Sequence, residues 1–319
     1  MKRTVLLCLA ALFATAAQAQ SYPAKPLRML LAFPPGGPTD INARVFAQKM
    51  GESMNVQVVV DNKPGAGGNI AAAEAARAPA DGYTIFYNTS AITIAPALYS
   101  KVAYDTLKDF APVALAATVP LVLAVHPGVP AKNVQELIAH VKASPGKLNY
   151  ASSGAGTITH LASALFAAQA GLQLQHIPYK GSAPALADVA GGQTQMMIDT
   201  INTVLPYARD GRLRALAIAM PRRSPALPEV PTLEEAAGMP GFEMSAWQGV
   251  VVPAGTPKDV IAKLNAEVNK AAQNPDLRQR LATMGAVTLG GTSEEYAAYI
   301  RSELTRWAKV VKDAGAKAE

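Results

Sequence analysis

The sequence alternates short apolar runs with longer stretches in which apolar residues recur every three or four positions. Runs of the first kind predict buried strands, and stretches of the second kind predict helices. The clearest of them are the strands 27–33, 56–62, 83–90 and 113–127 and the helices 40–50 and 133–143. Strands that alternate with helices in this way predict an α/β fold with mainly parallel sheets and helices on their faces.

Two apolar segments predict that the chain is built as two lobes. We interpret residues 113–127 and 213–221 as a pair of strands that cross between the lobes. The segment between the crossings is then inserted into the rest, which gives lobe 1 as 20–122 plus 224–319 and lobe 2 as 123–223. A length of 319 residues suits two domains of ordinary size. Ligands of open α/β sheets bind outside the carboxyl ends of the strands, so we expect a site in the cleft between the lobes.

Residues 1–19 have the pattern of a cleavable secretory signal peptide. Lys2 and Arg3 precede the apolar run 5–16, and small residues end at Ala19. This order is typical of signal peptides, and the apolar run is too short to span a membrane. We expect cleavage after Ala19 and a periplasmic mature protein. An N-terminal amphipathic helix is the alternative.

The composition of the mature chain excludes several classes of function. Cys8 is the only cysteine and leaves with the signal, so we expect no disulfide, no thiolate metal site and no thiol chemistry. Lys2 and Arg3 also leave, so the formal net charge of +6 falls by two. The basic residues are scattered and aromatic residues make up 6% of the chain, which argues against a nucleic-acid partner. The remaining charge predicts mild attraction for anionic solutes or only an ordinary charged surface.

The stretch FPPGGPTD at 33–40 links the first predicted strand to its helix. Gly36 and Gly37 permit backbone conformations closed to other residues, and Thr39 or Asp40 can cap the helix. The free amides of a first helical turn, together with the helix dipole, favour an anion. The carboxylate of Asp40 opposes a bare anion unless backbone amides occupy it. The alternative is a rigid turn that holds no ligand.

A second glycine-containing turn, SSGAGTITH at 152–160, also precedes a predicted helix. It offers hydroxyl groups at Ser152, Ser153 and Thr157. It lacks the third glycine of a dinucleotide fingerprint and the Gly-Lys-Ser/Thr of a phosphate-binding loop, so a phosphate cofactor is not expected. A small anion or an amide remains open as its ligand. A third such turn, at 62–72, is followed by alanines, and there tight helix packing is favoured over ligand binding.

The sequence gives little support for catalysis. The histidines His126, His140, His160 and His176 lack metal-ligand spacing, and there is no Gly-x-Ser-x-Gly nucleophile elbow. His160 lies one turn into its helix, where it is either a hydrogen-bond partner near a ligand or a core histidine. No motif in the sequence requires a cofactor or a metal ion, and none is expected.

Asp199 and Trp247 are two further candidates for a binding role. Asp199 ends an apolar strand, where an acid would face the cleft and accept hydrogen bonds from an amine or a hydroxyl. A cap for the following helix is the alternative. Trp247 is interpreted either as a wall of a ligand site or as packing at a hinge.

Several segments together closely resemble the Bug family of periplasmic solute-binding receptors, which are of the tripartite tricarboxylate transporter type. The resemblance covers almost all of the mature chain in the same order. Its segments are LRMLLAFPPGGPTDINARVFAQKM (27–50), VVVDNKPGAGGNIAAAEAARAPADGYTI (58–85), LNYASSGAGTITHLASALF (148–166), IPYKGSAPALADVAGGQTQMMID (177–199), residues 211–238 and WQGVVVPAGTP (247–257). The chain departs from the family at Thr200, where an asparagine is common, and at NTSAIT (88–93), which replaces a more glycine-rich loop.

The resemblance implies a two-lobed Venus-flytrap fold of the type II periplasmic binding class, a monomer and no enzymatic activity. It implies a small carboxylate as ligand, namely a dicarboxylate, an acidic amino acid or an aromatic carboxylate. Backbone amides and ordered water at 33–40 and 152–157 would hold one carboxylate, and variable residues would contact the far end. The implied site residues are Phe33, Gly36, Gly37, Pro38, Thr39, Asp40, Asn88, Thr89, Ser90, Ser152, Ser153, Gly156, Thr157, His160, Tyr179, Lys180, Asp199 and Trp247.

Two functions of other classes remain open from the sequence. A periplasmic hydrolase or isomerase acting on carboxylates would need a base such as Asp199 or His160 beside its substrate. A sensor module that passes ligand information to a membrane kinase would use the same pocket. Membrane transporter subunits or a sensor kinase are the partners that these interpretations imply, beside the carboxylate itself.

Overall fold

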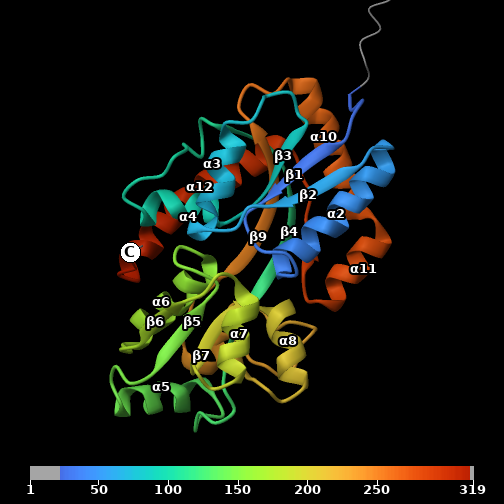
Figure 1. The fold of residues 1–319 in the computed structure, drawn as a ribbon. Helices are drawn as coiled ribbons and strands as arrows, with labels where there is room; N and C mark the ends of the chain where they lie inside the picture. Colours follow the sequence, from blue (N-terminus) through green and yellow to red (C-terminus); the bar gives the residue numbers. More distant parts are fainter. Residues whose placement is uncertain (1–21, 317–319) are drawn as a thin grey trace, which may run out of the picture.

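The computed structural model describes residues 22–316, which form two lobes joined by long strands (Figure 1). In this view lobe 1 lies above and lobe 2 below. The architecture is the two-lobed α/β fold that the sequence predicts. The predicted signal peptide, residues 1–19, lies outside the described residues.

One set of paired strands runs through both lobes in the order β2-β1-β3-β9-β4-β7-β5-β6, and β8 and β10 also pair with β4. β1 is parallel to β2 and β3, and β5 is parallel to β6 and β7, whereas β4 and β9 run antiparallel to their neighbours. The strands are β1 (Leu27–Leu31), β2 (Val58–Asn62), β3 (Thr84–Thr89), β4 (Phe110–Val125), β5 (Asn149–Ser152), β6 (Gln175–Pro178), β7 (Met196–Thr200), β8 (Arg214–Ile218), β9 (Ser245–Pro253) and β10 (Val287–Thr288).

Helices flank these strands. The helices are α2 (Pro38–Met54), α3 (Asn69–Ala76), α4 (Ala91–Leu98), α5 (Val134–Ala143), α6 (Ile158–Ala170), α7 (Ser182–Ala190), α8 (Ile201–Arg209), α9 (Leu233–Ala237), α10 (Lys258–Gln273), α11 (Pro275–Thr283) and α12 (Ser293–Asp313), with a short 3₁₀ turn at Ala66–Gly68. In lobe 1, α2, α10 and α11 lie on one side of the strands and α3, α4 and α12 on the other (Figure 1). Side chains of a strand alternate between its faces, so Met29 and Leu31 enter one core cluster and Leu30 enters a second.

The strand β4 passes through both lobes. Residues 110–120 pair with β9 in lobe 1, and residues 121–125 pair with β7 and β8 in lobe 2. Pro120 lies at the change of partner and pairs with Ser245, the first residue of β9. β4 and β9 therefore connect the lobes as two adjacent antiparallel strands.

The return from lobe 2 lies later in the chain than the sequence analysis placed it. β8 pairs with the lobe 2 half of β4, and α9 contacts α5 and β8. The amide of Met244 donates to the carbonyl of Ala219, immediately before β9 begins. Residues 224–244, assigned to lobe 1 from the sequence, therefore pack with elements of lobe 2. The five residues of β8 are too few to cross between lobes, and β9 makes that crossing.

A buried carboxylate ties α12 to β9 in lobe 1. The indole N–H groups of Trp247 and Trp307 both donate to Oε2 of Glu303, at 2.7 and 2.9 Å, and all three side chains are at most 3% exposed. Arg306 donates to the other oxygen of Glu303 at 3.1 Å. Two buried indole donors would lose their acceptor without this carboxylate, and such donors are costly to leave unpaired.

We expect Glu303→Ala to lower the free energy of unfolding by about 2–4 kcal/mol, because two buried N–H groups lose their partner. Urea unfolding followed by tryptophan fluorescence measures this loss. Arg301→Ala, on an exposed position of the same helix, is the matched control and should stay within about 0.5 kcal/mol of the wild type. Equal effects of the two substitutions would contradict the assignment.

Candidate functional site

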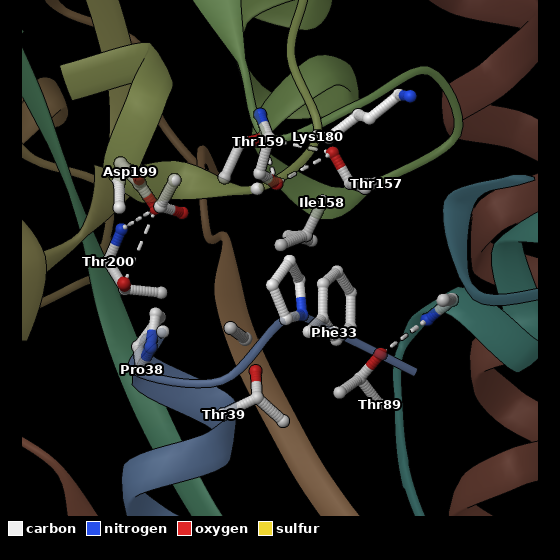
Figure 2. A pocket seen from close by; sticks show the side chains of 18 of the residues that line it. Phe33, Pro38, Thr39, Thr89, Thr157, Ile158, Thr159, Lys180, Asp199 and Thr200 are labelled. Atoms are coloured by element: carbon white, nitrogen blue, oxygen red, sulfur yellow. Dashed lines mark hydrogen bonds between the residues drawn. The ribbon is translucent and has the colours of Figure 1, made fainter. Parts of the chain in front are cut away.

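A cavity of about 230 Å³ lies between the lobes and is lined from both of them. Cavities for drug-sized ligands are larger, about 300–1,000 Å³, so this one suits a small molecule. Figure 2 shows Phe33 and Ile158 near its centre, Thr39 and Pro38 on the α2 side, and Asp199 with Thr200 at the left. The lining residues are Phe33, Pro34, Pro35, Gly37, Pro38, Thr39, Thr89, Ser90, Ala91, Ser153, Thr157, Ile158, Thr159, Lys180, Gly181, Ser182, Ala183, Pro184, Asp199, Thr200 and Ala246.

Five helices begin at this cavity. Their N-cap residues are Gly37 of α2, Ser90 of α4, Thr157 of α6, Gly181 of α7 and Thr200 of α8, and all five line it. Gly37 and Gly181 have no side chain, and the side chains of Ser90, Thr157 and Thr200 make no capping hydrogen bond to their helices. The first amides of a helix have no partner within the helix, so these starts present N–H donors at the cavity wall.

Four of the helices that begin elsewhere in the described residues differ in this respect, whereas α3 and α10, with N-caps Gly68 and Pro257, also lack a side-chain cap. The N-cap side chains Asn133 of α5, Thr232 of α9, Asn274 of α11 and Thr292 of α12 each accept a hydrogen bond from a backbone amide of the first turn. Among the helices that begin at the cavity, a side chain accepts a hydrogen bond from a first-turn amide in α4, where Thr89 Oγ1 accepts from the Ala91 amide at 3.3 Å. Amide donors and aligned helix dipoles together favour a negatively charged ligand.

The carboxylate of Asp40, in the turn 33–40, is engaged in hydrogen bonds within the protein. Asp40 accepts hydrogen bonds from the Gly36 amide, Arg44 Nε and Asn62 Nδ2, each at 2.9 Å. Burial alone would raise the pKa of Asp40, but hydrogen bonds from Arg44, Gly36 and Asn62 outweigh it and lower the pKa. Asp40 is therefore an ionised carboxylate that anchors the turn through hydrogen bonds within the protein, and Thr39, whose neighbour Pro38 has no N–H, supplies the amide of this turn at the cavity.

The turn 152–157 is fixed by its own hydroxyl groups. Thr157 Oγ1 donates to the Gly154 carbonyl at 2.7 Å, and the Ser153 amide donates to Thr159 Oγ1 at 2.9 Å. Ser153 Oγ lies 2.9 Å from the same Thr159 oxygen. The positive φ values of Gly154 and Gly156, 136° and 78°, belong to a region that L side chains rarely adopt. The turn is thus rigid before any ligand arrives.

A stacked pair of histidines supports this turn from behind. The rings of His160 and His176 lie 4.0 Å apart and within 5° of parallel. The Gly156 amide donates to His160 Nδ1 at 3.3 Å, and His176 Nε2 lies 2.7 Å from Ser152 Oγ. Burial lowers the pKa of His160 to about 4, and burial with the neighbouring imidazole lowers that of His176 to about 3. Both rings are therefore neutral at pH 7, and His160 Nδ1 is an acceptor.

Asp199 lines the cavity wall but is fully buried. Its Oδ1 accepts from the Thr200 amide at 2.7 Å, while its Oδ2 has no hydrogen-bond partner among the described residues. Burial raises the pKa of Asp199 to about 6; the nearby hydroxyls of Ser182, Thr200 and Thr203 act in the opposite sense. The carboxylate is covered, and Thr200 and Ser182 line the cavity beside it.

The structure brings together ten of the residues proposed from the sequence: Phe33, Gly37, Pro38, Thr39, Thr89, Ser90, Ser153, Thr157, Lys180 and Asp199 all line the cavity. The side chain of Lys180 is exposed and extends away from the centre (Figure 2). Gly36, Asp40, Asn88, Ser152, Gly156, His160, Tyr179 and Trp247 lie outside the lining.

The residues outside the lining have partners within the protein. Asn88 accepts from Tyr296 at 2.6 Å, Tyr179 donates to Asp188 at 2.7 Å, and Trp247 donates to Glu303. Gly36, Asp40, Ser152, Gly156 and His160 support the two turns that reach the cavity. Their role there is to fix the backbone that presents the amides.

Sequence reasoning missed the first turn of α7 as part of the site. Pro34, Pro35 and Ala91 line the cavity within the segments 33–40 and 88–93 that the sequence singled out, and Gly181 and Thr200 were also noted; the lining residues not named from the sequence are Ile158, Thr159, Ser182, Ala183, Pro184 and Ala246. A signal was present in the Gly-Ser-Ala-Pro run at 181–184, because glycine and serine before a proline often open a helix.

Residues 22–316 contain no group of three or more His, Cys, Asp or Glu side chains arranged to hold a metal ion. None of the helices in this part of the chain has the length and apolar character needed to cross a membrane. Among the lining residues, the ionisable side chains are Lys180, which points outward, and Asp199, which is covered. Anion binding here would therefore rest on backbone amides and hydroxyls.

Comparison with known proteins identifies the family. Residues 42–316 match the model of the tripartite tricarboxylate transporter family receptor. The chain belongs to this family. It is 40% identical to protein BugT of Bordetella pertussis over 94% of this chain and 92% of that protein.

Solved structures of similar proteins have the same fold. The R. palustris protein Rpa4515 with adipate superimposes with a TM-score of 0.89 at 36% identity, covering 93% of this chain and 99% of that one. MatC of Rhodopseudomonas palustris with bound malate gives a TM-score of 0.86 at 34% identity, with 91% and 100% covered. The predicted family resemblance and Venus-flytrap fold are confirmed. Members of this family are solute-binding receptors, so the chain is a receptor and not an enzyme.

The buried histidine pair predicts a pH dependence of stability. An imidazole in the unfolded chain titrates near 6.5, whereas that of His160 titrates at about 4 in the folded protein. Between these values the unfolded chain binds a proton that the folded state does not, so stability is fully present above about pH 6.5 and is lost as pH falls. His160→Gln should remove about 2 kcal/mol of the stability difference between pH 7 and pH 5.

Urea unfolding at pH 7 and at pH 5, for the wild type and the variant, measures this difference. The expected result is a smaller loss at pH 5 for His160→Gln. Equal losses in both proteins would show that burial of His160 does not resist protonation.

Proposed function

We propose that this protein is a periplasmic receptor that captures a small organic carboxylate and delivers it to an uptake system of the tripartite tricarboxylate type. The observation that carries the proposal is the convergence of five helix starts without N-cap side-chain bonds on one cavity. Hydrogen bonds from amides to a carboxylate are charge-assisted and are stronger than neutral ones. The site thus offers an anion several N–H donors from helix starts, which an ordinary loop does not provide.

The carboxylate would be held where the starts of α2 and α6 face each other. Thr39 lies in the turn 33–40 of lobe 1, and Ile158 and Thr159 follow the turn 152–157 of lobe 2. The two oxygens of one carboxylate would therefore contact both lobes. Apolar surface from Phe33, Pro34 and neighbouring residues would cover the hydrocarbon part of the ligand. The adipate and malate in the two similar structures support this ligand class.

Closure around such a ligand would shift an existing balance between open and closed lobes, because a ligand that contacts both lobes binds the closed arrangement more tightly. The candidate bases of an enzyme give no comparable support. Asp199 is covered, and His160 is stacked on His176 and bonded to the backbone of its own turn. Location in the periplasm rests on the signal-peptide pattern of residues 1–19 and on the family.

Isothermal titration of the purified mature protein with a panel of carboxylates tests the proposal. The panel should contain adipate, malate, aspartate, glutamate and benzoate, with the corresponding amides as uncharged controls. We expect at least one carboxylate to bind and its amide analogue to fail. Absence of binding by every carboxylate, with native folding confirmed by circular dichroism, would refute the proposed ligand class.

Removal of a single amide donor gives a sharper test. Ile158 is the first residue of α6, a position that favours proline, and Thr157 before it has the extended backbone (φ −86°, ψ 164°) that proline requires. Ile158→Pro should therefore fold but lose one donor, which weakens binding of the carboxylate about 10- to 100-fold. Ile158→Ala keeps the amide and trims the same side chain, so it is the matched control. Equal affinities of the two variants would show that this amide does not contact the ligand.

A further inference from the structure

A tyrosine outside the cavity joins the two lobes at the turn that would hold the ligand. Tyr99 follows α4 in lobe 1, and its hydroxyl donates to the carbonyl of Ala155 in lobe 2 at 3.0 Å. Ala155 lies within the turn 152–157, directly before the start of α6. We propose that Tyr99 is a positioning residue that holds the closed, ligand-retaining arrangement of the lobes through this bond.

Two glycines from opposite lobes make this approach possible. A Cβ atom on Gly67 of lobe 1 would lie 2.6 Å from the Ala155 carbonyl oxygen and 2.9 Å from the Tyr99 hydroxyl. A Cβ atom on Gly156 of lobe 2 would lie 2.8 Å from the Tyr99 ring and 3.1 Å from Leu98. Cβ contacts under 3.0 Å essentially never occur, and the short contact of Gly67 is with a backbone oxygen, so a side chain at Gly67 would push the lobes apart, whereas one at Gly156 would displace the Tyr99 ring.

The contact assigns a role to the third glycine-rich turn, at 62–72. Its expected role was packing of the following helix, and Gly68 does lie close to Ala32 and Ala91. Gly67, however, faces Ala155 across the lobe boundary. Both glycines beside Tyr99 also have positive φ, 62° for Gly67 and 78° for Gly156, so each is required by conformation as well as by space.

The turn 152–157 is thus held on two sides. Within lobe 2 the Gly156 amide donates to His160, and this bond does not depend on where lobe 1 lies. From lobe 1 the Tyr99 hydroxyl reaches Ala155, and this bond breaks when the lobes separate. Tyr99 is absent from the cavity lining, so its contribution to ligand retention is indirect. Burial raises its pKa, which keeps the hydroxyl protonated as a donor.

The inference rests on the proposed receptor function for its effect on ligand, but the lobe contact itself can be measured without ligand. Spin labels at Gln48→Cys on α2 and Gln135→Cys on α5, both exposed positions in different lobes, report the lobe separation by double electron–electron resonance. We expect Tyr99→Phe to reduce the closed-to-open population ratio of the ligand-free protein about 3- to 10-fold, which corresponds to one neutral hydrogen bond. Adipate dissociation, where adipate binds, should accelerate by the same factor.

Two matched controls isolate the contact. Tyr104→Phe removes a tyrosine hydrogen bond of equal length, to Asn69 Oδ1 at 3.0 Å, that lies wholly within lobe 1. It should leave the lobe distances unchanged. Gly67→Ala should also reduce the closed fraction, whereas Gly238→Ala should not, because Gly238 has the same φ of 62° and nothing within 4 Å of its Cβ position.

A wild-type distance distribution that lacks the closed separation, or one that Tyr99→Phe and Gly67→Ala leave unchanged relative to their controls, would overturn the proposal. If Tyr99→Phe fails to fold, the comparison of Gly67→Ala with Gly238→Ala tests the proposal by the same distance measurement. If the wild type binds no carboxylate, the proposed function is refuted but the lobe contact is not, because the distances are measured without ligand.

Discussion

The constraint on which the structure depends is the need of helix amides for partners. Each of the strands β1, β3, β5, β6 and β7 ends at a turn that opens a helix, and the parallel pairs place these turns at the same edge of their sheets. Two lobes that face each other across β4 and β9 then direct five helix starts at one volume. Unpaired buried N–H groups are costly, so this volume favours water or an anion over an apolar filling.

The local parts of this arrangement could be predicted, and the tertiary parts could not. Gly36, Gly154 and Gly156 mark turns because their positive φ disfavours other residues, and strand-turn-helix units follow from hydrophobic periodicity. The family resemblance placed Trp247 and Asn88 at the far end of the ligand, with packing at a hinge as the alternative for Trp247. Their partners Glu303 and Tyr296 are 56 and 208 residues away in sequence, and no local pattern records such a pairing.

The lobe boundary shows the same limit. The run at 213–221 is apolar enough to be a crossing strand, but an apolar strand of five residues has the same pattern wherever its neighbours lie. What decides its place is pairing with residues 122–125 of β4 and the parallel bridge from Ile218 to Thr232. Asp199 is a comparable case, since its position at a strand end was readable while its complete burial depended on the hydroxyls packed around it.

The turn 152–157 explains how such a receptor binds tightly and still releases its ligand. Its hydroxyl bonds and its contact with His160 exist within lobe 2, so the amides of α6 are preorganised and little ordering entropy is lost on binding. In our proposal its contact with Tyr99 is made only between closed lobes. A neutral hydrogen bond contributes a net of about 0.5–1.5 kcal/mol, which is too little to hold the lobes closed permanently. The balance is therefore left to a ligand that bridges both sets of amides, as differential affinity requires.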